Sequence, residues 1–432
     1  MRRTRLDRLD EACLNVGSVD EPWTVHLEIR VEGRLDDELV RRAVVAAMAT
    51  HPLARAHIVA WRPTDFRYWW EISDQPGDVP LTVVDCAESG NVATARNKLL
   101  SRAPELQRRI FEVLLAHAPG GDYLILNLHH AGGDGISAHR LMTSILRHYA
   151  NEPDPVPSFD PLEARNVRDI IGAHGAKDRW TRSKRFGRYL RQNLRKPARV
   201  QTSGGTRISG YGCHPMRLDA EQTAAILARR PEGTTVNDLL VGALAVTIRR
   251  WNDAHGTKKP RRVSITVPVN VRPAEWQHEV LGNFASYVTV NVPRKSQRDS
   301  HTATGAVHEC TSEMKGIGAQ GIMVDLLKVS QIMPAGVKKL IQRRPLVGDR
   351  AVDTTWLTNL GRLDLPVHLG ETAGAVTELG FSAPATMPMG VTLGVATMGD
   401  EMFLTFRYRH PQFDAAAAAD FAALFQRALE SG

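Results

Sequence analysis

The sequence contains no apolar run long enough to cross a membrane. Nowhere in its 432 residues do about 18 apolar residues follow one another, the length that a transmembrane helix needs. The N-terminus, Met1 to Arg8, is rich in arginine but is not followed by the apolar core of a signal peptide. These absences predict a cytoplasmic protein that does not span a bilayer.

Cysteine is scarce as well. The chain has four cysteines that lie far apart: Cys13, Cys86, Cys213 and Cys310. Because no two of them form a C-x-x-C pair, the spacing argues against both a disulfide framework and a structural zinc site. We expect buried free thiols and no bound metal.

Positive charge is in excess, with 55 Lys and Arg against 47 Asp and Glu and a net charge of +8. This balance favours an acidic partner: a carrier protein, coenzyme A, nucleic acid or an anionic membrane surface. No zinc-finger, RNP-type or basic-zipper pattern accompanies the charge, so we do not expect nucleic acid. Hydrophobic residues make up 43%, which is typical of a folded globular protein.

The length exceeds what one hydrophobic core usually supports, so two core-bearing halves are expected. Apolar periodicity predicts strands at residues 25–31, 68–72, 81–84, 111–116, 123–129, 212–218, 262–269 and 285–292 and a terminal strand pair at 391–408. It predicts helices at residues 35–48, 93–102, 136–149, 235–251, 306–333 and 414–429. The fold class is therefore α/β (α+β).

A proline-rich stretch, residues 151–157, interrupts the chain after the helix ending near Tyr149. We place a first lobe at residues 1–165, a basic inter-lobe bridge at 166–205 and a second lobe at 206–432. Within the bridge, Lys177 to Arg199 is dense in Lys and Arg with aromatic residues between them. Three interpretations stay open for it: docking of an acidic carrier, contact with anionic lipid, or a solvated helix face.

The most informative stretch runs from Tyr123 to Ser137, and its pattern predicts a strand, a glycine loop and the start of a helix. Side chains alternate along a strand, so His130 shares a face with Leu128 while His129 points the other way. An imidazole at the end of a rigid strand is suited to take a proton from an attacking alcohol or amine. Asp134 precedes the helix, where the N-terminal amides favour negative charge.

Residues 129–135 match the pattern His-His-x-x-x-Asp-Gly. The chain resembles the acyltransferase superfamily that contains chloramphenicol acetyltransferase, plant BAHD acyltransferases, bacterial wax ester synthases and nonribosomal peptide condensation domains. Further similar segments follow in the same order, at residues 51–56, 267–272, 281–287 and 358–361. Ala54 stands where the first of these segments usually has leucine. The segment 281–287 makes the free-standing condensation-domain-like proteins the closest group.

The resemblance implies two chloramphenicol acetyltransferase-like lobes, each a mixed β-sheet with flanking helices, which form a V-shaped pseudo-dimer with a tunnel between them. It implies His130 as general base, Asp134 paired with a structural arginine for which Arg272 is the candidate, and Gly135 beside the tunnel with an amide that helps an oxyanion. His129 is a supporting residue. The expected substrate contacts are Asn359 and Ser286.

The same resemblance implies an acyl donor bound as a thioester, on coenzyme A or on the phosphopantetheinyl arm of an acyl or peptidyl carrier protein, with no permanently bound cofactor. The acceptor is a small amine or alcohol, and natural-product biosynthesis is the expected setting. One alternative is a wax ester or diacylglycerol-type O-acyltransferase, because residues 235–240 resemble the helix start of those enzymes. Two others are a different reaction on a carrier-bound substrate and a binding module without catalysis.

Overall fold

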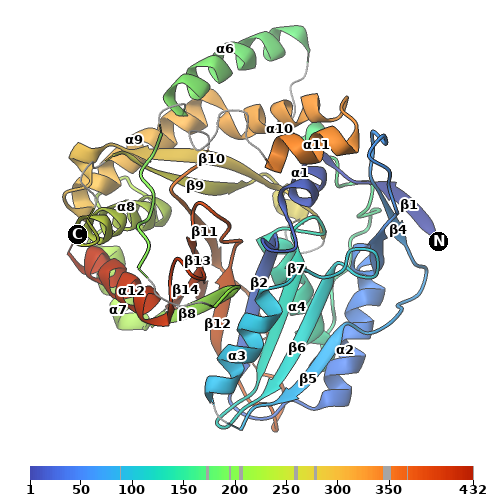
Figure 1. Ribbon diagram of the computed structural model, residues 1–432. Coiled ribbons are helices and arrows are strands. Elements are labelled where there is room, and N and C mark those ends of the chain that lie inside the picture. The colour runs from blue at the N-terminus through green and yellow to red at the C-terminus, as the bar shows by residue number, and fades with distance from the viewer. Residues whose placement is uncertain are drawn as a thin grey trace.

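The computed structural model describes residues 1–87, 89–171, 175–193, 196–203, 208–256, 261–276, 280–343, 352–366 and 368–431. Figure 1 shows two large β-sheets next to each other, with helices covering each of them. Both sheets mix parallel and antiparallel pairs. The expected α/β class with two mixed sheets and flanking helices is confirmed.

The N-terminal lobe is built on a five-stranded sheet in the order β12-β2-β7-β6-β5. Its strands are β2 (Thr24–Val31), β5 (Leu81–Asp85), β6 (Phe111–His117), β7 (Tyr123–His129) and β12 (Val376–Ser382). On one face, Leu115 and Leu124 join the core under α2 (Asp37–Thr50) and α4 (Gly135–Tyr149). Their sequence neighbours Leu114 and Ile125 point to the opposite face and pack with α3 (Ser89–Leu100).

The C-terminal lobe contains a six-stranded sheet in the order β10-β9-β11-β13-β14-β8. Its strands are β8 (Tyr211–Leu218), β9 (Val263–Asn270), β10 (Ala285–Val292), β11 (Thr355–Arg362), β13 (Val391–Met398) and β14 (Glu401–Arg409). The helices α7 (Ala220–Ala228), α8 (Val236–Ala254), α9 (Ser300–Ile317) and α12 (Ala415–Glu430) pack around it. Trp251, Phe406 and Phe421 are central in this second core.

A small third sheet, in the order β1-β4-β3, covers one side of the N-terminal lobe. It is formed by β1 (Arg2–Arg5), β3 (Ala56–Ile58) and β4 (Trp69–Ile72). The helix α1 (Arg8–Val16) follows β1 and packs against α10 (Ala319–Ser330) and α11 (Ala335–Arg343). Of these elements, only β4 and α10 are among the helices and strands predicted from periodicity.

One strand of the N-terminal sheet comes from the C-terminal part of the sequence. β12 pairs antiparallel with β2, so that Gly380 lies opposite Glu28. The division predicted at residues 165 and 206 therefore does not separate two sheets. A buried polar side chain also connects the two sheets: Arg407 of β14 donates to the carbonyls of Thr24 and Leu100 at 3.0 and 2.8 Å.

The predicted basic bridge, residues 166–205, contains α5 (Val167–Ile171) and α6 (Ala176–Asn193), and Gly204 and Gly205 lie outside the described residues. Figure 1 shows α6 beside α10 at the top of the molecule. Part of the charge of α6 is used within the fold, because Arg182 donates to the Ile171 carbonyl at 2.7 Å and Arg185 to the Ile317 carbonyl at 3.1 Å. Trp180 is 65% exposed and lies under the Lys184 ammonium.

Most predicted elements are present, with one instructive difference. The region 306–333, expected to be largely helical, contains two helices that are separated by Gly318. Gly318 has φ +65° and serves as the C-cap of α9, a left-handed conformation that glycine adopts without steric strain. Within the described part of the chain, no helix combines the length and the apolar composition that crossing a bilayer requires.

Candidate active site

β7 carries His130 to the beginning of the glycine loop. The strand ends at His129. The His130 amide donates to the Trp23 carbonyl at 2.9 Å, so the pairing of β7 with β2 extends by one residue beyond the two strands. A Cβ at Gly132 would lie 2.9 Å from the side chain of Ile110, so only glycine fits the close turn that follows. The His130 side chain is thereby held in a buried position, with the residue 5% exposed.

Asp134 connects the start of α4 with Arg272 and Phe284 of the C-terminal lobe. It is the N-cap of α4, and its Oδ1 accepts from the Ser137 amide at 2.9 Å. The same carboxylate accepts from the Arg272 Nη2 at 3.2 Å and from the Phe284 amide at 2.8 Å. The Asp134–Arg272 ion pair expected from the resemblance is therefore present. Burial alone would raise the pKa of Asp134, but Arg272 and the amide donors together hold it below its ordinary value.

Asn283 fixes the protonation pattern of the His130 ring. Its Nδ2 donates to Asp10 Oδ1 at 2.9 Å and to the His130 carbonyl at 2.7 Å, so the amide can have only one orientation. Its Oδ1 then faces the His130 Nδ1 at 3.1 Å, and since an oxygen cannot donate, that ring nitrogen must carry the hydrogen. The Nε2 atom therefore carries no hydrogen, and its lone pair can accept a proton, as a general base must.

The N-terminal helix α1 supplies two further neighbours of the site. Asp10 accepts from Asn283 and is ion-paired with Arg165, and Cys13 Sγ lies 3.5 Å from the His130 Nδ1. Burial raises the pKa of the Cys13 thiol well above its usual range, so the thiol stays protonated and does not act as a nucleophile at neutral pH. No motif in the sequence of α1 predicted this role.

The two adjacent histidines have different surroundings. Burial is the main cause that lowers the pKa of His130, while Asp134 and Asn283 act in the opposite direction. Burial lowers the pKa of His129 to about 3, and its Nδ1 accepts from the Ala131 amide at 3.1 Å. Both rings are therefore neutral at pH 7. His129 supports the loop, and His130 has the contacts expected of a positioned base.

Aromatic side chains line the neighbourhood of His130. The Trp23 ring lies 6.3 Å from the His130 ring and makes an edge contact with Trp356, which in turn contacts Tyr287. These residues come from the segment before β2, from β11 and from β10, so both lobes contribute. A low-polarity surrounding of this kind strengthens electrostatic effects on a reacting group.

The other predicted site residues have structural contacts. A Cβ at Gly135 would lie 2.7 Å from Leu360 and 3.0 Å from Phe381, so glycine allows the two lobes to pack closely at the start of α4. Ser286 is fully buried, and its hydroxyl donates to the Gln320 carbonyl at 2.7 Å. Asn359 Oδ1 accepts from the Gly361 amide at 2.8 Å within β11, where the pairing of this strand with β13 shifts register. Contacts of Ser286 and Asn359 with a substrate stay predictions that this geometry does not favour.

The segment that resembles lipid acyltransferases also has a structural explanation. Thr235 caps α8 by accepting from the Asp238 amide at 3.1 Å, and Asp238 accepts in return from the Thr235 amide. The Asp238 carboxylate is further bonded to His308 and Thr311 of α9. A helix cap that also fastens two helices accounts for these residues without a lipid acceptor.

Asp10, Cys13 and Asn283 were missed as functional candidates in the sequence. Asn283 lies inside the similar segment 281–287, between Gly282 and Phe284, and that segment is the signal that could have found it. Asp10 and Cys13 carry no local motif, and only the packing of α1 brings them to His130.

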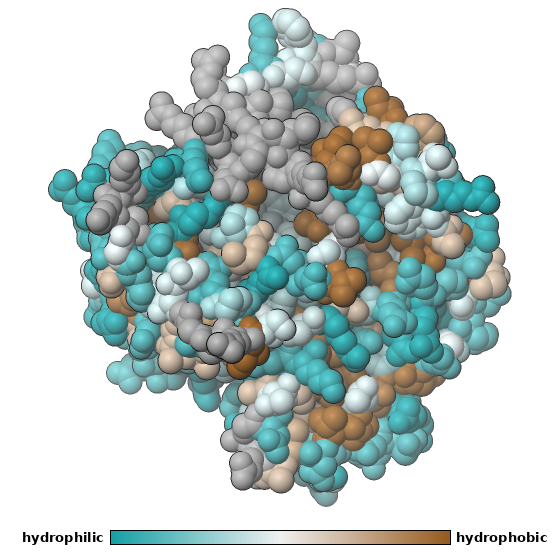
Figure 2. All heavy atoms as spheres, viewed as in Figure 1, coloured by the Kyte–Doolittle hydropathy of each residue, from teal (hydrophilic) through white to brown (hydrophobic). Residues whose placement is uncertain are grey.

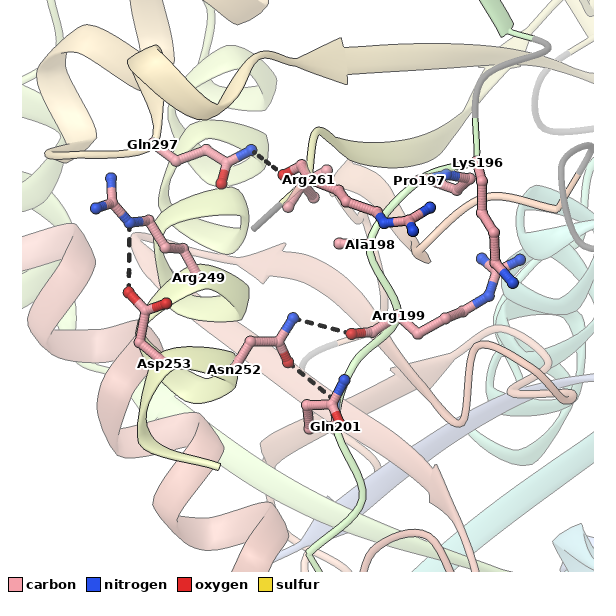
Figure 3. Close-up of a pocket in the computed structure, with 11 residues that line it drawn as sticks. Lys196, Pro197, Ala198, Arg199, Gln201, Arg249, Asn252, Asp253, Arg261 and Gln297 are labelled. Atoms are coloured by element: carbon pink, nitrogen blue, oxygen red, sulfur yellow. Dashed lines mark hydrogen bonds and ion pairs between the residues drawn. The ribbon is translucent and has the colours of Figure 1, made fainter. Parts of the chain in front are cut away.

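A separate pocket of about 220 Å³ lies where the end of the bridge docks on α8. In Figure 3, Asn252 reaches the chain segment of the bridge, donating to the Arg199 carbonyl and accepting from the Gln201 amide, each at 2.9 Å. Arg249 and Asp253 form a nearby ion pair at 3.5 Å. The pocket contains none of the predicted site residues, so we interpret it as part of the bridge attachment.

Comparison with known proteins gives a relative that matches over nearly the whole chain and many similar folds. No family model matches the chain. Rv2305 of Mycobacterium tuberculosis, a protein of uncharacterized function, is 36% identical over 431 residues that cover 98% of each chain. The trichothecene 15-O-acetyltransferase TRI3 of Fusarium sporotrichioides has a TM-score of 0.74 at 10% identity, covering 99% of this chain and 95% of that one.

The first condensation domain of the calcium-dependent antibiotic synthetase, in complex with a substrate analogue, has a TM-score of 0.73 at 15% identity. It covers 99% of this chain and 96% of that chain. At these low identities the similar structures establish the fold, which is that of condensation domains and chloramphenicol acetyltransferase-like enzymes over the full length.

We predict that Asp134→Ala destabilises the protein by about 3 to 5 kcal/mol, because it leaves Arg272 as a buried charge without its carboxylate. Urea unfolding measures this. The double variant Asp134→Ala/Arg272→Met should recover part of the loss. Arg217→Ala is the control, since it breaks an exposed pair with Glu401 and should cost less than about 1 kcal/mol.

The pH dependence of the pair follows from its pKa. Because the pKa of Asp134 is lower in the folded state than its ordinary value, the pair stabilises the protein above that ordinary value, and this stabilisation is lost as the pH falls through the lowered pKa. Additive losses in the double variant would show that the two side chains do not stabilise each other.

We predict that His130 carries its hydrogen on Nδ1 and that Asn283→Leu lowers its pKa further and mixes the two ring tautomers, because one acceptor facing Nδ1 is removed. Nitrogen-15 NMR of the imidazoles reports both quantities, with the His130 signal identified by its loss in His130→Gln. Asn291→Leu, which removes an amide bonded to Arg262 and Ser264, is the control and should leave the His130 signal unchanged. An Nε2–H tautomer in the unaltered protein would refute the assignment.

Proposed function

Because this chain belongs to the family of Rv2305 within the condensation-domain and chloramphenicol acetyltransferase-like superfamily, we propose that it is an acyltransferase with His130 as general base. It transfers an acyl group from a thioester to an amine or hydroxyl acceptor. The observation that carries the proposal is the orientation of the His130 ring, whose Nδ1 faces an acceptor that leaves Nε2 unprotonated.

In the proposed reaction, the acceptor nitrogen or oxygen attacks the thioester carbonyl while its proton moves to His130 Nε2. The carbonyl oxygen becomes an oxyanion, for which the amide of Gly135 at the N-terminus of α4 is the candidate donor. Collapse of the tetrahedral intermediate breaks the carbon–sulfur bond. The leaving thiolate takes the proton back from His130, so the base is regenerated and no covalent enzyme intermediate forms.

The buried groups around His130 suit this cycle. The imidazolium that forms during the reaction lies near Asp134 and Asp10, whose negative charges both raise the pKa of His130 and stabilise its protonated form. Neither carboxylate needs to exchange a proton, since Asp134 is held ionised by Arg272. We therefore assign Asp134 a positioning role and His130 the proton transfer.

The donor in this proposal is acyl-coenzyme A or an acyl or peptidyl carrier protein, and the acceptor is a small amine or alcohol, as in natural-product biosynthesis. Both donor types carry the acyl group as a thioester of phosphopantetheine, so the same residues could act on either donor. The net charge of +8 favours the approach of such acidic donors. No resident cofactor is required for the transfer.

The test is thiol release from acyl thioesters, followed with and without amine and alcohol acceptors. We expect acceptor-dependent release that falls about 10²- to 10⁴-fold in His130→Ala with little change in thermal stability. His129→Ala is the matched control, because its ring holds the loop through the Ala131 amide, and it should lower the melting temperature more than the rate.

The outcomes separate the candidate functions. Acceptor-independent release would indicate thioester hydrolysis, and tight thioester binding with no turnover would indicate a binding module. Equal rates in His130→Ala and the unaltered protein would remove His130 from the chemistry. Release that depends on long-chain alcohols alone would favour the lipid O-acyltransferase alternative.

A further inference from the structure

A group of exposed apolar side chains lies on one side of the molecule. Five of the twelve large hydrophobic side chains that are exposed among the described residues come from just two segments: Phe66 (52%), Trp69 (40%), Ile332 (75%), Val337 (42%) and Leu340 (59%). Figure 2 shows brown side chains gathered at the upper right, in the region that α10 and α11 occupy in Figure 1. We call these five residues and the half-buried Trp61 the apolar ridge.

Backbone contacts hold the two segments of the ridge together. The amide of Ala335 donates to the Asp65 carbonyl at 2.7 Å, and the amide of Gly336 donates to the Pro63 carbonyl at 2.9 Å. A Cβ at Gly336 would already lie 3.1 Å from Pro63, so the contact is close. The ridge is therefore a fixed feature of the fold, although its parts are far apart in the sequence.

The helix α11 is turned so that it buries charge and exposes apolar groups. Lys338 is 2% exposed, and its Nζ donates to Glu11 and to the Phe66 carbonyl, both at 2.8 Å. Val337 and Leu340, three positions apart and so on one face, point to solvent instead. A helix that only had to be soluble would have the opposite arrangement, with lysine outside and leucine inside.

Positive charge accompanies the ridge. Arg62 and Arg67 are exposed on the same loop as Phe66, and the Lys339 Nζ lies 5.4 Å from the centre of the Trp61 ring. The acidic side chain of this loop, Asp65, is only half-exposed and accepts from the Arg62 amide at 2.6 Å. The surroundings of the ridge are thus basic, which complements an anionic surface.

We propose that the apolar ridge inserts into the headgroup region of an anionic membrane. Tryptophan is the residue most typical of the membrane–water interface, exposed aliphatic side chains supply the apolar area that enters it, and arginine and lysine bind the lipid phosphates. Ridge residues that project from the surface, such as Ile332 and Leu340, suit a soft bilayer that adapts to them. This surface is distinct from α6, where Arg182 and Arg185 are bonded within the fold.

The experiment is sedimentation of the full chain with two kinds of vesicle: phosphatidylcholine alone, and phosphatidylcholine with about one third phosphatidylglycerol. We expect binding to the anionic vesicles, weakened when the salt is raised from about 0.1 M to about 1 M, since the screening length then falls from about 10 Å to about 3 Å. The variant Ile332→Ser/Val337→Ser/Leu340→Ser should bind these vesicles at least about tenfold more weakly.

A matched control is Val156→Ser/Ile208→Ser, which removes apolar side chains of 62% and 60% exposure outside the ridge and should bind like the unaltered protein. A second variant, Arg62→Ser/Arg67→Ser, should lose the preference for anionic over neutral vesicles. Absence of binding by the unaltered protein, or equal binding by the triple variant, would overturn the proposal. So would gel filtration showing that the triple variant dissociates a dimer, because a second copy of the chain would then cover the ridge.

Discussion

The arrangement around His130 depends on one buried carboxylate, that of Asp134. A buried negative charge is stable only if donors surround it, and here the donors come from α4 and from residues 272 and 284 of the other lobe. The Ser137 hydroxyl adds to this junction by donating to the Gly282 carbonyl and accepting from the Gly282 amide. The site is therefore complete only when the two lobes are in contact.

This junction also explains how Asn283 reaches His130. Gly282 and Phe284 are both bonded to the start of α4, so the residue between them is directed to the other side of the chain, where the His130 ring lies. The tautomer of His130 thus depends on Asp134 through two intervening contacts. A carboxylate that does not touch the reacting atoms can therefore be essential to the geometry of the base.

The sequence predicted the local part of this site well and the non-local part poorly. The strand β7, the glycine loop and the cap of α4 follow from alternation, glycine and an N-cap residue within 15 neighbouring positions, and the Asp134–Arg272 pair followed from the resemblance. No strand was predicted at β12, and its place in the first sheet could not be inferred, because its pairing with β2 joins residues about 350 positions apart. Only the folded chain reveals such a partner.

α1 was missed for a different physical reason. Its buried face includes Arg8, Asp10, Glu11 and Asn15, so the apolar periodicity that indicates a packed helix is weak. Each of these side chains has a partner elsewhere in the chain, as Asp10 has Arg165 and Glu11 has Lys338. From the sequence alone such residues predict a solvated surface, because the partners that stabilise them in a buried position come together only in the tertiary structure.

The same network sets the strength of the proposed base. Removing His130 from water lowers its pKa, which keeps the ring unprotonated at neutral pH but also makes it a weaker proton acceptor. Asp134, Asn283 and Asp10 each shift the pKa upward and offset part of that loss. The same three side chains also form the hydrogen bonds that connect the glycine loop, the segment at residue 283 and α1. The geometry of the site and the basicity of His130 therefore have a common origin. A change that loosens the junction between the lobes must therefore alter both properties together.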